Sequence, residues 1–214
     1  FPGTSTGSLA SRVASNITKK FLPYCEYAID LHTGGSSRYN YPQIRYGAKI
    51  EECEDLAHAF QAPFIIDHPM IPNSFRKTAS EHSVKTIVYE GGESIRLDGP
   101  AISYGKNGVL NVLKYLNMLS VSNPNENTVK TSIIKVQKTY WQRAGKSGIF
   151  IWTKCSGSYV DKGEVLGFIK DPYGYSKTEV ICKYAGYIIG HNNASVVNHG
   201  DALFHIGIEY ENNY

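Results

Sequence analysis

The sequence has few cysteines, no long apolar segment and little net charge. Its four cysteines, Cys25, Cys53, Cys155 and Cys182, lie far apart without the C-x-x-C spacing of a metal site. This pattern favours reduced thiols in a cytoplasmic protein over a disulfide framework. No apolar run approaches the roughly 18–20 residues that span a bilayer, so we expect no membrane partner. The net charge of +3 comes from scattered Lys and Arg residues, which argues against a nucleic-acid partner.

The composition is that of an ordinary globular protein. Of the 214 residues, 42% are hydrophobic and 19% are charged, which fits one large domain or two modest ones. The opening residues 1–8 (FPGTSTGS) contain neither an initiator Met nor the apolar core of a signal peptide. They are typical of a loop interior, so we expect a mature, cleaved or truncated chain.

Residues 1–122 alternate between helical and strand patterns, which predicts an α/β domain with a parallel or mixed sheet. The expected helices cover 9–21, with Ser8 as the N-cap, 51–60, a segment from Asn73 or Ser74, and 102–119. The expected strands cover 27–32, 63–67 and 85–90. The polar, Tyr-rich segment 36–47 is expected to be a loop.

The helical period ends at residue 120. Residues 120–127 (SVSNPNEN) form a polar segment with Pro and Asn, which predicts a linker. Short apolar segments separated by Gly, Asn and Asp turn signals follow it, and they indicate a small all-β domain. We therefore expect an α/β domain over 1–122 and a β domain over 123–214.

Two polar residues come at the ends of predicted strands, and both are candidates for chemistry. His32 follows the apolar run Ala28–Leu31 and Glu90 follows Ile87–Tyr89, and two glycines come soon after each. Ligands of open α/β sheets bind outside the carboxyl ends of the strands. A histidine there can bind a metal, and a carboxylate can take a proton from a metal-activated water. The alternative is that both side chains are satisfied by neighbouring backbone groups.

Several motifs together resemble those of one enzyme family. They are FPG at 1–3 with GS at 7–8, IDLHTGG at 29–35, YNYPQIR at 39–45, YEGGE at 89–93 and GVLNVL at 108–113. In this combination the chain resembles the succinylglutamate desuccinylase/aspartoacylase family of zinc-dependent deacylases, nearest to its branch of predicted bacterial deacylases. The resemblance covers almost the whole chain. It implies a metallocarboxypeptidase-like mixed sheet flanked by helices, followed by a small barrel-sandwich hybrid.

The resemblance also implies roles for the two candidate residues. His32 corresponds to the later zinc-ligating histidine and Glu90 to the general base. The family's other two ligands lie in an H-x-x-E motif, and no H-x-x-E occurs in this sequence. A catalytic zinc usually takes three protein ligands, so we expect this chain to bind Zn²⁺ weakly or not at all. We expect it to be the carboxyl-terminal part of a longer deacylase, catalytically incomplete by itself.

Arginines are the candidates for holding a substrate carboxylate, because a guanidinium can bind it through two parallel hydrogen bonds. Arg45 follows the histidine loop and Arg76 precedes Glu90. The family places a substrate-contacting arginine before its catalytic glutamate, and Arg76 is the nearest candidate. The alternative for Arg76 is a solvated surface arginine.

The expected activity is hydrolysis of an amide bond in a small N-acylated amino acid or amine, in the bacterial cytoplasm. The alternative is a non-catalytic binding or scaffold protein that has lost its metal site. A third interpretation makes the β domain an acyl or biotin carrier modified at Lys177, although the carrier motif around that lysine is missing. The sequence does not indicate an oligomeric state, so a homo-oligomer is left open.

Overall fold

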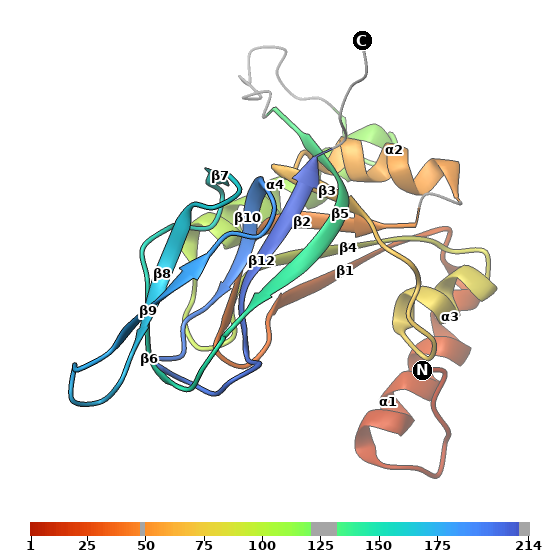
Figure 1. Cartoon of the computed structure of the whole chain (residues 1–214). Helices are drawn as coiled ribbons and strands as arrows, with labels where there is room; N and C mark the ends of the chain where they lie inside the picture. Colours follow the sequence, from red (N-terminus) through yellow and green to blue (C-terminus); the bar gives the residue numbers. More distant parts are fainter. Residues whose placement is uncertain (48–49, 121–131, 210–214) are drawn as a thin grey trace.

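The computed structural model describes residues 1–47, 50–120 and 132–209 (Figure 1). Its α-helices are α1 (Leu9–Lys20), α2 (Glu51–Phe60), α3 (Phe75–Glu81) and α4 (Gly99–Tyr115), with a short 3-10 helix at Leu22–Tyr24. The strands of the first half are β1 (Tyr27–Gly34), β2 (Arg38–Tyr46), β3 (Phe64–Asp67) and β4 (Lys85–Glu93). The second half contributes β5 (Ile134–Arg143), β6 (Gly148–Trp152), β7 (Tyr159–Val160), β8 (Val165–Lys170), β9 (Lys177–Ile181), β10 (Gly186–Asn192), β11 (Val196–Val197) and β12 (Ala202–Glu209).

The larger sheet has eight strands in the order β1-β4-β2-β3-β5-β12-β10-β7. The pairs β1–β4, β2–β3 and β3–β5 are parallel, whereas β2–β4 and β5–β12 are antiparallel. The sheet is therefore mixed, as predicted. β2 also pairs with β10 through residues 38–40, so β2, β3, β5, β12 and β10 form a closed, barrel-like ring of pairings.

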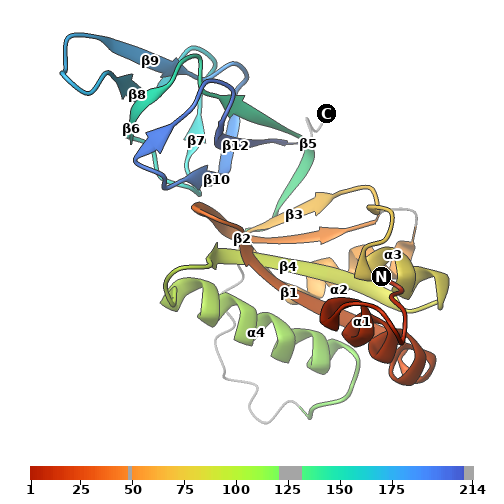
Figure 2. The same ribbon diagram turned by 90° about the horizontal axis from the view of Figure 1, so that it is seen from below.

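A smaller sheet, in the order β11-β6-β8-β9, packs against β10 and β12 of the larger one. Figure 2 shows these strands gathered on one side of the molecule and the helices on the other. Buried apolar side chains from both sheets fill the space between them, and they include Phe150, Leu166, Ile169, Val180, Ile188 and Phe204. The larger sheet runs through both halves of the chain, and the boundary at 122/123 stays a prediction. Most of the predicted linker falls on 121–131, outside the described residues.

Two helices support the strand that carries Glu90. Apolar side chains of α2 and α4 pack with β2 and β4, and the ring of Phe60 stacks on that of Tyr89 with centroids 5.2 Å apart. The hydroxyl of Tyr89 donates a 2.6 Å hydrogen bond to the carbonyl oxygen of Ala101 in α4. β4 is therefore fixed from behind at the residue next to Glu90.

Three expectations from the sequence need correction. Segment 38–46 is the strand β2, not a loop. Pro42 in its middle lies where the β2–β4 register shifts, and the shift interrupts the alternation of buried and exposed side chains by which strands are identified. β1 is an edge strand with half-exposed residues, although its apolar run 28–31 is typical of a buried strand. β1 and β4 also continue past His32 and Glu90 to Gly34 and Glu93, so neither candidate ends its strand.

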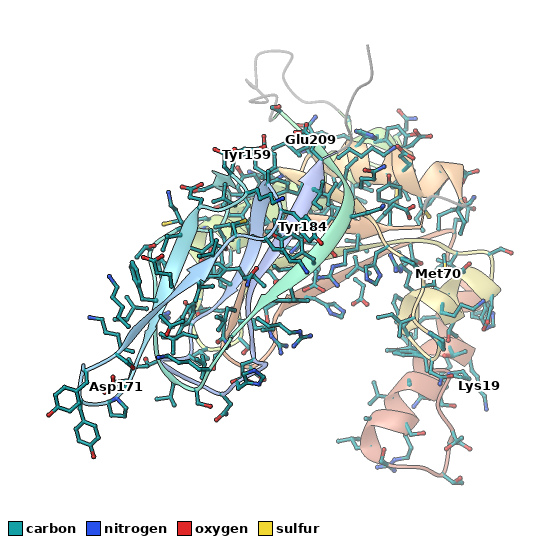
Figure 3. All side chains as sticks on the ribbon, in the orientation of Figure 1. Lys19, Met70, Tyr159, Asp171, Tyr184 and Glu209 are labelled. Carbon is teal, nitrogen blue, oxygen red and sulfur yellow. The ribbon has the colours of Figure 1, made fainter. Side chains whose placement is uncertain are left out.

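Helix α1 forms where its periodicity predicts, and the Ser8 side chain accepts a hydrogen bond from the Ser11 amide. Its apolar residues Leu9 and Val13, and Phe21 at its C-cap, are nevertheless exposed, whereas the buried positions are Ala14, Ser15 and Thr18. The helix therefore packs through small residues. Figure 3 shows α1, which carries Lys19, at the opposite end of the molecule from Asp171 in the β8–β9 hairpin.

All four cysteines carry free thiols, in agreement with the prediction from their spacing. Among the described residues, no helix combines the length and apolar character required to cross a membrane.

Candidate functional site

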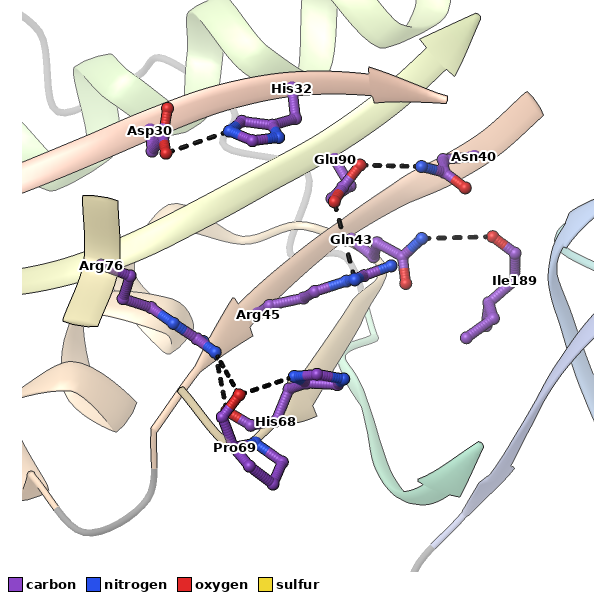
Figure 4. Close-up of polar contacts among 10 residues, drawn as sticks. All are labelled: Asp30, His32, Asn40, Gln43, Arg45, His68, Pro69, Arg76, Glu90 and Ile189. Atoms are coloured by element: carbon purple, nitrogen blue, oxygen red, sulfur yellow. Dashed lines mark hydrogen bonds and ion pairs between the residues drawn. The ribbon is translucent and has the colours of Figure 1, made fainter. Parts of the chain in front are cut away.

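Glu90 lies between two neighbouring strands that both direct polar groups toward it. The parallel register of β1 and β4 pairs His32 with Glu90. From β2, the Asn40 side-chain amide donates a 2.8 Å hydrogen bond to Oε2 of Glu90, and Nη1 of Arg45 lies 3.7 Å from Oε1 (Figure 4). Glu90 itself is only 9% exposed. Its carboxylate is thus contacted at both oxygens, at Oε2 by the Asn40 amide and at Oε1 by the Arg45 guanidinium.

His32 is oriented by a carboxylate on its own strand. Its Nε2 lies 3.0 Å from Oδ2 of Asp30, two residues earlier and therefore on the same side of β1. When Nε2 donates to Asp30, the neutral ring keeps its lone pair on Nδ1, the atom through which it can bind a proton or a metal. The side chain of His32 is 48% exposed, so this nitrogen is open to ligands from solution.

Arg76 is buried rather than solvated, so the surface-arginine alternative is wrong. The residue is 6% exposed, and its Nη2 donates hydrogen bonds of 2.8 and 2.9 Å to the carbonyl oxygens of His68 and Pro69. Burial, and then the charge of Arg45, lower the pKa of the Arg76 guanidinium. Within the described part of the chain its buried Nη1 has no hydrogen-bond partner, so one end of the fork keeps an unused donor.

The four predicted site residues line one cavity of about 620 Å³. Its polar wall consists of Asp30, His32, Arg45, His68, Ser74, Arg76 and Glu90. Its apolar wall comes from α1, α3, the strands and the segment between β3 and α3, and includes Ile17, Ile29, Ile71, Phe75 and Val88. The structure thus brings His32, Glu90, Arg45 and Arg76 together, and their roles stay predictions.

The β-rich half of the chain reaches the back of this site through β12. His205 is buried there, with its ring stacked on Trp141 at 4.4 Å between centroids. Burial, followed by the nearby charges of Arg45 and His68, lowers the pKa of His205 to about 3, so the ring is neutral at physiological pH. Neither Nε of Arg45 nor Nδ1 of His205 has a partner in the described ranges.

Sequence reasoning missed Asp30, Asn40, His68 and His205. Asp30 could have been found from strand alternation, because residues two apart on β1 share a face. Asn40 required 38–46 to be recognised as a strand. His68 and His205 are brought to the site only by tertiary packing.

The described residues do not complete a catalytic zinc site. Across 1–47, 50–120 and 132–209, no group of three or more His, Cys, Asp and Glu side chains is placed to hold a metal ion. His32 and His68 both line the cavity with Glu90, but they are not grouped around one point, whereas a catalytic zinc takes three protein ligands. These residues by themselves therefore do not fit the metal.

Comparison with known proteins shows which family has this sequence and fold. The family model described as the succinylglutamate desuccinylase/aspartoacylase catalytic domain matches residues 1–116. Among solved structures, the chain is similar to a succinylglutamate desuccinylase/aspartoacylase from Rhodobacter sphaeroides, with TM-score 0.84 and 22% identity over 98% of this chain and 66% of that one. It is also similar to the product-bound ectoine utilization protein EutE (DoeB) from Ruegeria pomeroyi, with TM-score 0.83 and 21% identity over 97% and 65%.

An aspartoacylase family protein from Mesorhizobium loti is similar as well, with TM-score 0.79 and 18% identity over 98% of this chain and 65% of that one. No curated protein gave a significant match. The chain spans just under two thirds of the length of these solved structures. The family match covers more than half of the 214 residues, and the mixed sheet with its flanking helices agrees with it. The chain therefore belongs to the succinylglutamate desuccinylase/aspartoacylase family.

Proposed function

We propose that the protein hydrolyses the amide bond of small N-acylated amino acids or related amines. Family membership supports deacylase activity in general. The observation that carries the finer proposal is that Glu90, His32, Arg45 and Arg76 line one cavity of about 620 Å³. Pockets of a few hundred to about 1,000 Å³ are usual for small ligands.

In this proposal Glu90 is the general base. It takes a proton from a water molecule, the water oxygen attacks the acyl carbon, and the proton passes to the departing nitrogen as the C–N bond breaks. Asn40 and Arg45 support the role, because they hold the two oxygens of the Glu90 carboxylate. A base fixed in this way meets the water without first reorganising.

The substrate's carboxylate is expected to bind the arginines. Arg76 has its Nη1 buried at the cavity without a described partner, and Arg45 lies between it and Glu90 (Figure 4). An anionic group bound there would satisfy that donor and offset the charge of two close guanidiniums. This favours acylated amino acids over neutral amides.

Zinc enters the proposal only through the resemblance to zinc-dependent deacylases. His32 would supply one ligand, and a bound ion would need two more than the described residues gather around it. We therefore derive no step through the metal. A cytoplasmic location and a homo-oligomeric state also stay predictions.

The test is hydrolysis of N-acetyl- and N-succinyl-amino acids, assayed by release of the free amine. The 214-residue chain is compared with the product of its gene read upstream of Phe1, each with and without added Zn²⁺. We expect amine release from a longer product that supplies H-x-x-E and none from the 214-residue chain. Activity of the 214-residue chain would contradict its catalytic incompleteness. If the longer product were folded, zinc-loaded and inactive on the whole panel, the non-catalytic alternative would replace the proposal.

A further inference from the structure

A second polar cluster lies away from the Glu90 cavity and forms a continuous chain of hydrogen bonds. The hydroxyl of Ser156 lies 2.7 Å from Nδ1 of His191, and Nε2 of His191 lies 3.0 Å from Oδ1 of Asn193. The Asn193 amide nitrogen then donates a 2.9 Å bond to Oε2 of Glu93. The cavity beside these hydrogen-bonded residues shares no lining residue with the cavity at Glu90.

Which group donates in each of these hydrogen bonds follows from the charge of Glu93. The Arg96 guanidinium lowers the pKa of Glu93, so this carboxylate is ionised and accepts only. Asn193 must therefore direct its amide nitrogen toward Glu93 and its oxygen toward His191. That oxygen accepts from Nε2–H of His191, which leaves the lone pair of the neutral ring on Nδ1. The hydroxyl of Ser156 consequently donates its proton toward a free base.

The imidazole is kept neutral and in place by its surroundings. His191 is buried, and its ring is flanked by Trp152 at 4.8 Å and Tyr39 at 5.2 Å. Burial lowers the pKa of His191, so the ring carries no charge at neutral pH. Ser156 and its base are thus paired in the protonation state in which a histidine removes a hydroxyl proton.

The backbone also fixes the serine. The loop between β6 and β7 is tied to β10 by the bond from Gly157 N to Ile188 O (2.7 Å) and by that from Ile188 N to Ser158 O (2.9 Å). Ser156 is half-buried at the surface of this loop. Beside the imidazole a cavity of about 270 Å³ opens, with walls that include Tyr39, Trp152 and Arg96. Of the proposed pair, His191 lines this space, and Ser156 adjoins it through its contact with Nδ1 of the His191 ring.

We propose that Ser156 is a nucleophile that takes the acyl group from small activated carboxylic esters, with His191 as its base and Asn193 and Glu93 as positioning residues. Oγ forms a bond to the carbonyl carbon while its proton moves to Nδ1 of His191. The bond from that carbon to the leaving oxygen then breaks, and the leaving oxygen takes the proton. Water can then hydrolyse the acyl-serine: it gives a proton to His191 and attacks the acyl carbon, and Oγ of Ser156 leaves and takes the proton back.

The test is acylation of the full chain by p-nitrophenyl acetate and phosphonylation by a fluorophosphonate, followed by intact mass and peptide mapping. We expect one acyl group, on the peptide that contains Ser156. Ser156→Ala should abolish it, whereas Ser158→Ala, an exposed serine in the same loop, should not change it. His191→Gln should slow labelling by at least about 100-fold, the size of a general-base contribution.

Because His191 is buried, its variant is compared with Asn193→Ala, which leaves the imidazole in place but removes its hydrogen-bond partner, and both are checked by circular dichroism. A folded wild-type chain that gains no label on Ser156 would overturn the proposal. If folded His191→Gln or Asn193→Ala were labelled as fast as the wild-type chain, the proposal would be overturned as well. The cluster would then serve only to join the β6–β7 loop to β10.

Discussion

The packing behind Glu90 allows a stability prediction at Gly108 of α4. A Cβ atom added there would lie 2.1–2.3 Å from ring carbons of Phe60, where ordinary carbon contacts are about 3.5–4.0 Å. Phe60 cannot easily move aside, because it is 1% exposed and stacks on Tyr89. Overpacking of this severity costs about 3 kcal/mol. Replacing a helical glycine by alanine returns about 1 kcal/mol of helix propensity.

Gly108→Ala should therefore lower the free energy of unfolding by about 2 kcal/mol. At the size of this chain the melting temperature should fall by about 4–8 °C. Urea denaturation followed by circular dichroism measures the first quantity and calorimetry the second. The matched control is Asn107→Ala, an exposed position on the same helix, which should be neutral or slightly stabilising.

A second substitution locates the cause. Phe60→Leu removes the ring that the new methyl group meets, so Gly108→Ala should cost much less in a Phe60→Leu background. If Gly108→Ala were as stable as Asn107→Ala, α4 would not pack against Phe60 as described. The support of β4 by this helix would then need another explanation.

Two further predictions concern buried titratable side chains near the site. The pKa of His205 is about 3 in the folded protein and 6.5 in its ordinary state, so the unfolded chain takes up this proton first. Its contribution to stability is therefore complete above pH 6.5 and is lost as the pH falls toward 3, with a slope of up to about 1.4 kcal/mol per pH unit. His205→Gln should flatten urea-derived stability over this range, and parallel curves would contradict the burial argument. Arg76→Lys should lower the free energy of unfolding by about 1–3 kcal/mol, because one ammonium cannot reproduce the two hydrogen bonds from Nη2 to the His68 and Pro69 carbonyls. An unchanged midpoint of urea denaturation would show that these hydrogen bonds do not stabilise the loop.

Local patterns predicted much of the fold and part of the site. Helix 51–60 was predicted to the residue, and in the structure it ends at a left-handed C-cap, Gln61. His32 and Glu90 were found because each polar residue follows an apolar run. They meet because β1 and β4 are parallel neighbours in matching register.

The remaining site residues depend on contacts that no local pattern reports. Asn40 reaches Glu90 only because β2 lies beside β4, and Pro42 conceals that strand in the sequence. His205 lies near Arg45 because the ring of strands closes through the β2–β10 pairing, which joins residues about 150 positions apart. The burial of Arg76 was unexpected because isolated arginines are usually at the surface.

The central claim is that Glu90 moves the proton in amide hydrolysis, and steady-state kinetics of Glu90→Gln test it most directly. The variant is made in whichever form of the protein releases amine in the assay above, with Glu81→Gln, an exposed position on α3, as the control. The substitution keeps the size of the side chain but removes the proton-accepting carboxylate. We predict a fall in kcat of about 100- to 10,000-fold with an unchanged melting temperature, and no change for Glu81→Gln. A kcat within a few-fold of wild type for folded Glu90→Gln would contradict the account.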